Sequence, residues 1–303
     1  MSVETTIIPQ LSFVSESMKP KKVLVTGSEG FIGSHLFERL ANGGFLVAGA
    51  DIKNGIDIRT YKFSEKYDAI FHVAAQSSGP KSFDYPEESH SLNVLGTLRI
   101  LEYAKATGAK VIFSSSSSIY GETEILPTPE DSEHRPMSPY AFQKLICEEY
   151  LKFYWLSGVR SCALRYFGVF GERQELSSGD YNLMLPTFLN QYKNNEPFTI
   201  VGTGEQRRDF VYVGDVVEAN LKALDFLETA DKFEIFNVGT GKNYSVLEVA
   251  DMISENHPKV YLPPRSEPFA TLAHLDKAKT VLKWEPKVVL EEWLNKICQR
   301  YYI

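Results

Sequence analysis

Two residues near the middle of the chain, Tyr140 and Lys144, have the types and the spacing for general acid–base chemistry. They lie four residues apart in a stretch that opens with Ser138-Pro139, a serine N-cap followed by a proline at the first helical position. One helix face would therefore carry both side chains. A lysine ammonium beside a phenol favours the phenolate. We therefore expect the pKa of Tyr140 to fall from about 10 towards neutral pH, where a tyrosine becomes a usable general base.

A second group of residues has the spacing of a phosphate-binding turn. Gly27, Gly30 and Gly33 follow the apolar run Val23–Val25 and accompany an amphipathic stretch that begins at Phe31. In such a turn the glycines allow a tight bend, a close approach of the backbone to a diphosphate, and close packing of helix on strand. The helix N-terminus adds free N–H groups and a positive dipole end. An ordinary glycine-containing strand–helix turn is the alternative.

An acidic residue stands where the ribose of a dinucleotide would need one. Asp51 follows the apolar stretch 45–50 and lies 18 residues beyond Gly33, close to the roughly 20 that is usual for a contact with the 2′-hydroxyl. A carboxylate there would repel a 2′-phosphate, so NAD is favoured over NADP. Lys53 weakens that preference, and a surface aspartate at the end of a strand is the alternative.

The elements that would position these residues alternate between strand and helix. We expect strands at 23–25, 45–50, 67–73 and 110–115, and helices at 31–41, 86–107 and 138–157. This alternation predicts an α/β fold, a Rossmann-like doubly wound parallel sheet with helices on both faces. The carboxyl ends of the strands would bring together Gly27, Asp51, Ala74 and Ser114. Ser114 opens a run of five serines, a pattern that by itself is typical of a solvated turn.

The bulk composition excludes several kinds of partner. The 303 residues carry a net charge of −7, which gives no electrostatic reason to expect nucleic acid or an anionic membrane surface. No apolar run approaches the roughly 18 residues of a membrane span, and the first 20 residues do not have the pattern of a signal peptide. Cys147, Cys162 and Cys298 lie far apart without metal-ligand spacing, so we expect buried free thiols, no metal site and a cytoplasmic location.

Eight segments of the chain, taken in order, resemble the NAD-dependent sugar-nucleotide epimerase/dehydratase family, a group of extended short-chain dehydrogenase/reductases. Among the most specific are Thr-Gly-Ser-Glu-Gly-Phe-Ile-Gly at 26–33 and Gln-Arg-Arg-Asp-Phe-Val at 206–211. The matching segments are 26–36, 72–76, 89–97, 113–121, 140–144, 165–174, 206–213 and 237–241. The resemblance covers the chain from about Lys21 to its end, and the pattern is closest to the UDP-glucose 4-epimerases.

The resemblance implies a role for each matching position. The NAD-binding residues would be Gly27, Gly30, Phe31, Ile32, Gly33, Asp51, Asp57, Ile58, Val73, Ala74, Ala75, Gln76, Asn93, Ser114, Tyr140, Lys144, Tyr166 and Phe167. Within this set the resemblance implies that Asp51 holds the adenosine ribose, that Asp57 and Ile58 flank adenine, and that Tyr166 and Phe167 border the nicotinamide. Ser116 takes the position of the catalytic Ser/Thr, Tyr140 that of the acid/base, and Lys144 that of the lysine that binds the nicotinamide ribose.

Residues of the substrate site also follow from the resemblance. The substrate-binding residues would be Ser116, Ser118, Tyr140, Asn182, Leu183, Arg208 and Arg265. Arg208 would bind the substrate diphosphate, for which a planar and permanently charged guanidinium is suited. A structural ion pair of Arg208 with Asp209 or Asp215 is the alternative.

The domain organisation is expected to have two parts. Residues 1–20 form an extension of unknown role, and residues 21–175 form the NAD-binding domain, to which 207–240 return. Residues 176–206 and 241–303 form a smaller C-terminal α/β lobe that binds the nucleotide sugar, because the regular alternation weakens beyond about Phe170. We expect Trp284 and Trp293 to belong to the core.

The residues that follow the fourth predicted strand favour one reaction within the family. The 4,6-dehydratases carry Thr-Asp-Glu where this chain has Ser116-Ser117-Ser118, and the decarboxylases usually keep an acidic residue at the position of Ser118. The expected reaction is therefore UDP-sugar 4-epimerisation through a 4-keto intermediate, with UDP-glucose and UDP-galactose as first substrates. Alternatives are reduction of an NDP-4-keto-6-deoxy sugar, another epimerase or dehydratase of the family, and a non-catalytic dinucleotide-binding sensor or scaffold.

Three departures from the family pattern affect the expected substrate. Gly168 stands where the family usually has asparagine, Gly214 replaces a common aspartate, and no basic residue follows soon after Glu267 in the Arg265 segment. We expect Gly168 to enlarge the sugar site.

By analogy with the family, a homodimer is expected through a four-helix bundle of the helices at 86–107 and 138–157. Burial of their apolar residues against the chain's own sheet is the alternative. The apolar residues concerned are Leu92, Leu95, Leu98, Ile100, Leu101, Leu145, Tyr150, Leu151 and Phe153.

Overall fold

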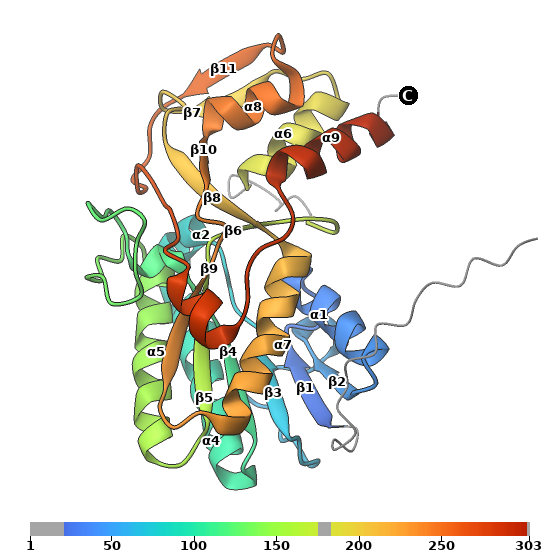
Figure 1. The fold of residues 1–303 in the computed structure, drawn as a ribbon, viewed down its shortest axis with the longest axis vertical. Coiled ribbons are helices and arrows are strands. Elements are labelled where there is room, and N and C mark those ends of the chain that lie inside the picture. The colour runs from blue at the N-terminus through green and yellow to red at the C-terminus, as the bar shows by residue number, and fades with distance from the viewer. Residues whose placement is uncertain (1–20, 175–182, 302–303) are drawn as a thin grey trace, which may run out of the picture.

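A parallel sheet of six strands is the centre of the computed structural model, which describes residues 21–174 and 183–301. Figure 1 shows this sheet in the lower half of the molecule, with a smaller group of strands and helices above it. Its strand order is β2-β1-β3-β4-β5-β9, and every neighbouring pair is parallel. The strands are β1 (Lys22–Thr26), β2 (Leu46–Ala50), β3 (Ala69–His72), β4 (Lys110–Ser116), β5 (Ser161–Tyr166) and β9 (Glu234–Val238). The predicted Rossmann-like sheet is confirmed.

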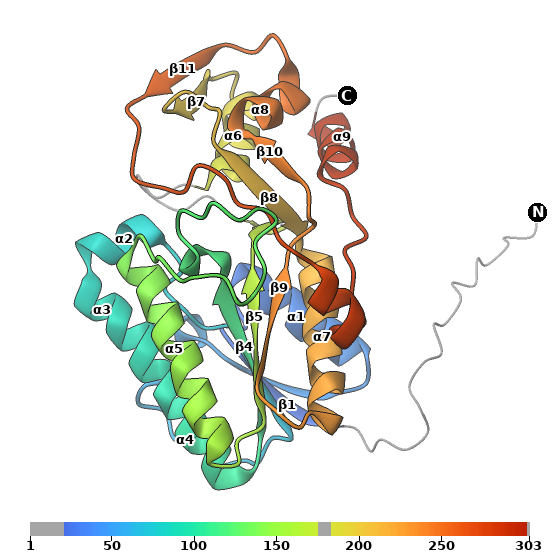
Figure 2. The same cartoon turned by 60° about the vertical axis from the view of Figure 1, so that its left-hand side comes forward.

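Helices cover both faces of this sheet, as Figure 2 shows from a second direction. On one side lie α1 (Phe31–Asn42) and α7 (Val213–Thr229); on the other lie α4 (Gly96–Thr107) and α5 (Pro139–Leu156). Successive side chains of a strand point to opposite faces of the sheet, so each strand contributes to the core on both sides. In β1, Val23 and Val25 pack on the first side and Leu24 packs on the second.

Local sequence signals place the helix that carries Tyr140 and Lys144. The Ser138 hydroxyl accepts a hydrogen bond from the Ala141 amide at 3.1 Å, and Pro139 occupies the first turn of α5. The predicted helix 86–107 is one helical stretch with an irregular middle. It consists of α3 (Pro86–His90), a π-helical turn η2 (Ser91–Leu95) and α4.

The upper part of the molecule holds two small sheets. The larger has the order β10-β8-β6 and the smaller pairs β11 with β7. Their strands are β6 (Gly168–Phe170), β7 (Phe198–Val201), β8 (Arg207–Tyr212), β10 (Asn243–Ser245) and β11 (Lys259–Leu262). The helices beside them are α6 (Met184–Lys193), α8 (Val246–Ser254) and α9 (Leu290–Tyr301). Phe170, Phe198 and Trp293 share a core in this part.

Two segments differ from the predicted division of the chain. Within the expected return segment 207–240, β9 joins the large sheet and α7 packs on its face, but β8 belongs to a small sheet. Part of the expected lobe 241–303 also packs on the large sheet. Trp284 is buried there, and its indole donates to the backbone oxygen of Asp215 at 2.9 Å. The apolar side chains near Trp284 pack against α7 and β9. These elements are distant in the sequence, so the contact could not be predicted from local patterns.

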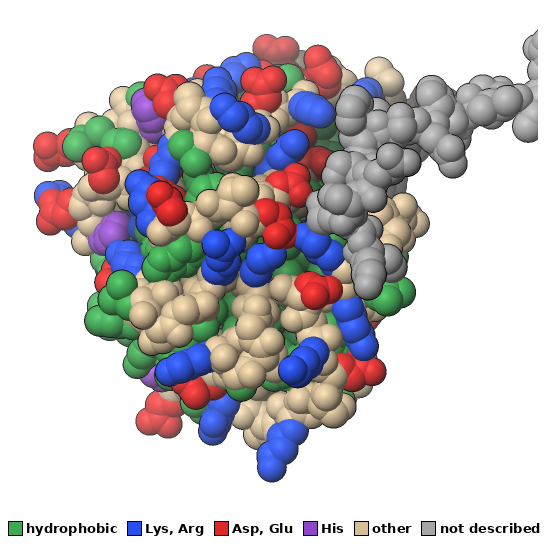
Figure 3. Space-filling view, turned by 60° about the horizontal axis from the view of Figure 1, so that its bottom comes forward, with side chains coloured by type: hydrophobic (Ala, Val, Ile, Leu, Met, Phe, Trp, Pro, Cys, Tyr) green, Lys and Arg blue, Asp and Glu red, His purple; other side chains and the backbone are tan. Residues whose placement is uncertain are grey.

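Among residues 21–174 and 183–301, no helix is long and apolar enough to cross a bilayer. On the face in Figure 3, basic and acidic side chains are mixed.

Candidate active site

The carboxyl ends of β1, β2 and β3 meet at one edge of the large sheet, and the glycine turn lies there. The Gly27 amide donates to the Ala50 oxygen at 2.7 Å, so the turn is tied to the end of β2. Gly27 has a φ of 73°, and a Cβ on it would come within 2.8 Å of the Ala74 nitrogen, just beyond β3. A Cβ on Gly33 would come within 1.9 Å of the Gly27 oxygen. Both positions therefore require glycine for the chain's own packing.

The same turn leaves the start of α1 suited to an anion. Gly30 is the N-cap of α1 and supplies no side-chain hydrogen bond to the first turn of the helix. The backbone N–H groups of the first turn, which includes Phe31 and Ile32, therefore have no side-chain acceptor at the N-cap. Together with the positive end of the helix dipole they can bind an anion. A dinucleotide diphosphate fits this arrangement.

Asp51 lies beside the turn. One of its carboxylate oxygens accepts a hydrogen bond from the Glu29 amide at 3.0 Å, and the other accepts from the Lys53 amide at 2.9 Å. Sequence position alone predicted that Asp51 would lie near the glycines, and the structure brings them together. The Lys53 ammonium donates to the backbone oxygen of Glu29 at 3.4 Å.

Asn93 and the segment after β3 form a second wall of the same edge. The Asn93 side chain accepts from the Gln76 amide at 2.8 Å and donates to the Gln76 oxygen at 3.1 Å. Asn93 is buried, Val73, Ala74 and Gln76 are partly exposed, and Ala75 is exposed. The segment 73–76 is thus fixed to η2 and remains accessible to a ligand.

Asp57 and Ile58 have partners within the chain. Asp57 forms an ion pair with Arg59, whose guanidinium holds the pKa of that carboxyl below its usual range. Ile58 is buried, and its side chain fills the space beside Gly96. Their predicted contact with adenine remains a proposal.

The three predicted catalytic residues converge where β4 ends and α5 begins. The Lys144 ammonium donates to the Ser114 oxygen at 2.7 Å and lies 5.9 Å from the centre of the Tyr140 ring. The Ser116 hydroxyl interacts with the Tyr140 phenol and lies 2.9 Å from the Ser118 hydroxyl. Helix spacing therefore does place Tyr140 and Lys144 side by side.

The pKa of Tyr140 differs from the expectation. Desolvation by the surrounding protein raises it to about 12, and the hydrogen bond with Ser116 offsets this only in part. Burial also lowers the pKa of Lys144 to about 8. Loss of hydration opposes charge on both groups, and for the phenol it outweighs the hydrogen bond with Ser116. The expectation of a lowered tyrosine pKa was therefore wrong for the protein chain by itself.

Tyr166 is the last residue of β5, next to the end of β4, and both Tyr166 and the following Phe167 are buried. The Tyr166 hydroxyl lies 3.1 Å from the Ser114 hydroxyl and accepts from the Asn220 amide group at 2.8 Å. The Tyr166 side chain is thus held from α7, on the opposite side of the sheet from Lys144.

Sequence analysis missed a buried ion pair behind the catalytic residues. Glu148 and Arg165 are both fully buried, with 2.7 Å between the carboxylate and a guanidinium nitrogen. Glu148 also accepts from the Ser115 hydroxyl at 2.5 Å. Glu148 lies one helical turn beyond Lys144, so the same four-residue spacing that paired Tyr140 with Lys144 was the signal that could have found it.

The two arginines proposed for the diphosphate lie beside one carboxylate. Arg208 forms an ion pair with Glu267 at 2.9 Å, and the guanidinium of Arg265 lies 3.8 Å from the same residue. The two alternative partners of Arg208 accept hydrogen bonds from backbone amides instead. The Asp209 carboxylate accepts from the amides of Thr240, Gly241 and Ala273. The Asp215 carboxylate accepts from those of Lys287 and Val288. Both arginines keep part of their side chains exposed.

A cavity of about 390 Å³ lies beside Arg265 and beside Glu267, the ion-pair partner of Arg208. Arg265, Glu267, Gln206 and Phe269 are among the residues that line it. Leu183 is exposed at the start of α6, and Asn182 lies outside the described residues.

The structure corrects the expectation for Gly168. A Cβ at this position would come within 2.9 Å of the Asp209 oxygen and 3.2 Å of the Phe210 ring, because β6 pairs with β8 there. The missing side chain therefore adds no open space to a sugar site. Gly214 is similar, since a Cβ there would meet the Tyr212 ring at 2.6 Å.

Comparison with known proteins agrees with this arrangement. The model of the NAD dependent epimerase/dehydratase family matches residues 23–239. A protein of Methanocaldococcus jannaschii, provisionally named UDP-glucose 4-epimerase, is 36% identical over 91% of this chain and 96% of its own length. The UDP-glucuronic acid decarboxylase 1 of Danio rerio is 30% identical over 97% of this chain and 75% of its own.

Among solved structures, the chain is similar to the UDP-N-acetylglucosamine 4-epimerase of Methanobrevibacter ruminantium in complex with UDP-N-acetylmuramic acid. The TM-score is 0.85 at 32% identity, over 93% of this chain and 98% of that one.

Proposed function

The chain belongs to the NAD-dependent epimerase/dehydratase family, and we propose that it inverts C4 of a UDP-sugar, with UDP-glucose and UDP-galactose as first substrates. Similar proteins act on several UDP-sugars, including the N-acetylglucosamine and glucuronic acid derivatives. The cofactor is NAD, as the family's description states. Which of the family's reactions the protein catalyses must be argued from the residues of its own active site.

The end of β4 carries this proposal. The strand ends at Ser116 and is followed by Ser117 and Ser118, and the hydroxyls of Ser116 and Ser118 are 2.9 Å apart. Elimination of a 6-hydroxyl requires a further acid and base beside the sugar, and neither Ser117 nor Ser118 supplies a carboxyl group. Epimerisation needs a proton to be removed from the 4-hydroxyl and later returned to it. Tyr140 with Ser116 and Lys144 would suffice for both transfers.

The residues for NAD are those at the strand ends. The first turn of α1 would hold the diphosphate, Asp51 the adenosine ribose, and the segment 73–76 with Asn93 the path towards the nicotinamide. When bound, NAD would accept the hydride from the sugar carbon and return it.

The catalytic residues of this chain would act on the 4-hydroxyl of the sugar. The Tyr140 phenolate oxygen would take the proton from that hydroxyl while the Ser116 hydroxyl donates a hydrogen bond to the same oxygen. Lys144, held by the Ser114 oxygen at 2.7 Å, would supply positive charge beside the phenolate. After the 4-keto sugar turns over, return of the hydride to the other face of C4 would invert that carbon, and Tyr140 would return the proton to the oxygen.

The diphosphate of the sugar nucleotide would bind near Arg208 and Arg265. Both guanidinium groups lie beside Glu267, and Glu122 also lines the adjacent cavity, so the site holds two positive and two negative side chains. The planar and permanently charged guanidinium groups suit a diphosphate, which would compete with Glu267 for them. The cavity beside Arg265 is the space that we assign to part of the nucleotide.

Incubation with UDP-galactose and a catalytic amount of NAD tests the proposal. We expect UDP-glucose to accumulate to an equilibrium mixture without net formation of NADH. Absence of product from UDP-galactose and also from the N-acetylated pair would overturn it. Stoichiometric oxidation of NADH by an NDP-4-keto-6-deoxy sugar would instead identify a reductase.

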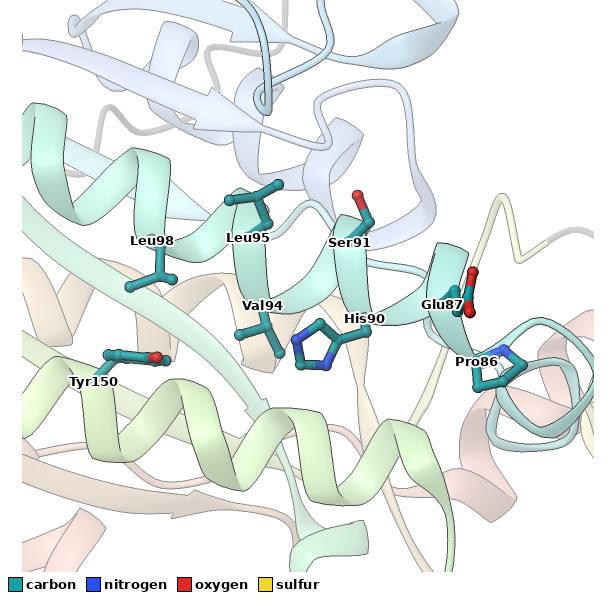
Figure 4. A pocket seen from close by; sticks show the side chains of 8 residues that line it. All are labelled: Pro86, Glu87, His90, Ser91, Val94, Leu95, Leu98 and Tyr150. Carbon is teal, nitrogen blue, oxygen red and sulfur yellow. The ribbon is translucent and has the colours of Figure 1, made fainter.

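We also propose that the protein forms a homodimer through the helices beside α5. A groove of about 590 Å³ lies between η2, α4 and α5, and Figure 4 shows the side chains that line it. Leu95, Leu98 and Tyr150 face this groove, whereas Ile100 and Leu101 are buried against the chain's own sheet. Two copies of the chain could cover each other's apolar grooves by self-complementary packing.

A cytoplasmic location is part of the same proposal. The three cysteines are unpaired, two of them buried and Cys298 partly so. Free thiols of this kind persist in a reducing compartment.

A further inference from the structure

A buried chain of hydrogen bonds lies directly beneath the proposed NAD-binding edge, with His72 at its centre. His72 is the last residue of β3, and its side chain is buried. Its Nδ1 lies 2.8 Å from the Thr26 hydroxyl at the end of β1, and its Nε2 lies 3.0 Å from the Thr97 hydroxyl in α4. The catalytic steps proposed above make no use of this imidazole.

The direction of each hydrogen bond follows from the neighbouring acceptors. The Thr97 hydroxyl lies 2.6 Å from the backbone oxygen of Asn93, which can only accept, so its proton is committed there. Nε2 of His72 must therefore carry a hydrogen and donate to Thr97. In a neutral imidazole Nδ1 is then an acceptor, and the Thr26 hydroxyl donates to it. Thr26 in turn accepts from the Ala74 amide at 3.2 Å.

Neutrality of His72 agrees with its surroundings. Burial lowers its pKa to about 3, and the nearby Lys144 ammonium acts in the same direction. The other groups that face it are the Phe113 ring from β4 and, through Thr97, the Cys147 thiol from α5. No carboxylate within the described chain makes a hydrogen bond to this ring.

The chain of bonds joins the three backbone segments that would contact NAD. Thr26 immediately precedes Gly27 of the phosphate-binding turn. Ala74 belongs to the segment after β3. Asn93, whose backbone oxygen ends the chain, holds Gln76 with its side chain. A single imidazole therefore fixes these three segments relative to one another.

We propose that His72, as the neutral Nε2–H tautomer, is a positioning residue for NAD that sets the spacing between the glycine turn, the segment 74–76 and Asn93. The inference rests on the NAD placement proposed above. His72 itself does not touch the cofactor; it acts through Thr26 and Thr97.

The tautomer can be tested without the cofactor. Nitrogen-15 NMR of the full chain with labelled histidine should show one ring with a protonated Nε2 and an unprotonated Nδ1, unchanged between pH 5.5 and 8.5. A His72→Gln variant should remove that signal and so assign it. A protonated Nδ1, or titration of this ring near its ordinary pKa of about 6.5, would overturn the proposal.

A matched pair of substitutions tests the link to NAD. Thr97→Val removes the hydroxyl but keeps the shape, and we expect it to raise the dissociation constant for NAD about tenfold, as the loss of a buried hydrogen bond would. Thr97→Ser keeps the hydroxyl and should restore binding to within about twofold of the original protein. Calorimetric titration of the full chain with NAD measures both.

Thermal unfolding of the same proteins separates positioning from stability. Equal NAD dissociation constants for Thr97→Val and Thr97→Ser, with a lower melting temperature for the former, would show a purely structural role and overturn the proposal. Absence of NAD binding by the unaltered chain would contradict the proposed function instead, and the tautomer measurement would still test His72.

His72→Asn and His72→Gln provide a second comparison if the Thr97 variants do not fold. Asparagine can place an acceptor near Thr26, and glutamine can place a donor near Thr97. We expect each to keep one half of the chain of bonds and to bind NAD more weakly than the original protein. Unchanged NAD binding in both variants would overturn the proposal.

Discussion

Tyr140 and Lys144 show how burial controls the chemistry of a single pair of residues. The pKa of the tyrosine is raised to about 12 and that of the lysine is lowered to about 8. Both shifts favour the uncharged form of the group, because the protein replaces water around it. The protein chain thus keeps the phenol protonated at neutral pH, and the phenolate depends on positive charge close to it.

A Tyr140→Phe variant tests the role of the phenol. We expect kcat for UDP-sugar epimerisation to fall by roughly 10²–10⁴-fold, the usual contribution of a general acid–base group. NAD binding should change little, since Lys144 and the glycine turn remain. A Tyr154→Phe variant on the same helix, with its hydroxyl paired to Glu102, is the control and should retain activity. Near-normal turnover by Tyr140→Phe would exclude it as the base.

The buried lysine predicts a pH dependence of stability. The pKa of Lys144 is lower in the folded chain, so between about pH 8 and the unfolded value of 10.5 the unfolded state binds more protons. The contribution of Lys144 to the free energy of unfolding therefore rises with pH across this window. Below pH 8 its burial as a cation costs about 3 kcal/mol.

Lys144→Met should remove that cost. At pH 7 we expect the variant to gain in stability relative to the original protein, apart from any loss of packing, and we expect this gain to shrink by pH 9.5. Urea denaturation of both proteins at the two pH values measures the difference, in which the other lysines cancel. A stability difference independent of pH would contradict the lowered pKa.

At the scale of elements, three successive turns of α5 hold the end of β4. Tyr140 interacts with Ser116, Lys144 with the Ser114 oxygen, and Glu148 with the Ser115 hydroxyl. The last of these contacts depends on Arg165 of β5, which neutralises Glu148. The helix and two neighbouring strands therefore share one set of buried polar contacts.

Breaking this ion pair should be costly. Arg165→Met leaves Glu148 buried without its partner, and we expect a loss of about 3–5 kcal/mol in the free energy of unfolding. The double variant with Glu148→Leu removes both charges and should recover most of the loss. Chemical denaturation of the three proteins provides the values. If the single and the double variant are equally destabilised, the charge pair is not the cause.

At the scale of the whole molecule, the exposed apolar groove between η2, α4 and α5 determines the expected assembly. Leu95 is 38% exposed at this groove, where a second chain would cover it. We expect Leu95→Glu to convert a dimer into a 34 kDa species at micromolar concentration, because a charge would be buried in an apolar interface. Sedimentation measures the change.

A matched control lies on β11. Val260 is 48% exposed on β11, which lies at the opposite end of the molecule from α4 and α5 in Figure 1, so Val260→Glu should leave the oligomeric state unchanged. A 34 kDa species for the unaltered protein would contradict the proposed dimer.

The sequence by itself determined the parallel character of the large sheet and four of its six strands, β1 to β4, together with the glycine turn, the cap of α5 and the pairing of Tyr140 with Lys144. These features depend on patterns within a few residues: the spacing of glycines, the four-residue helical repeat and the sequence Ser138-Pro139. The family followed from such local segments in a fixed order.

Only the tertiary structure decided features that depend on distant residues. Glu267 rather than Asp209 or Asp215 lies beside Arg208, and the backbone of β8 fills the space beside Gly168. The pKa of Tyr140 rises because parts of the chain that are distant in sequence displace water from around its phenol, although the residue keeps part of its surface exposed. Likewise, His72 joins Thr26 to Thr97 because parallel strands and a covering helix bring them into contact. Desolvation and long-range pairing arise only when the chain is packed, so no local pattern records them.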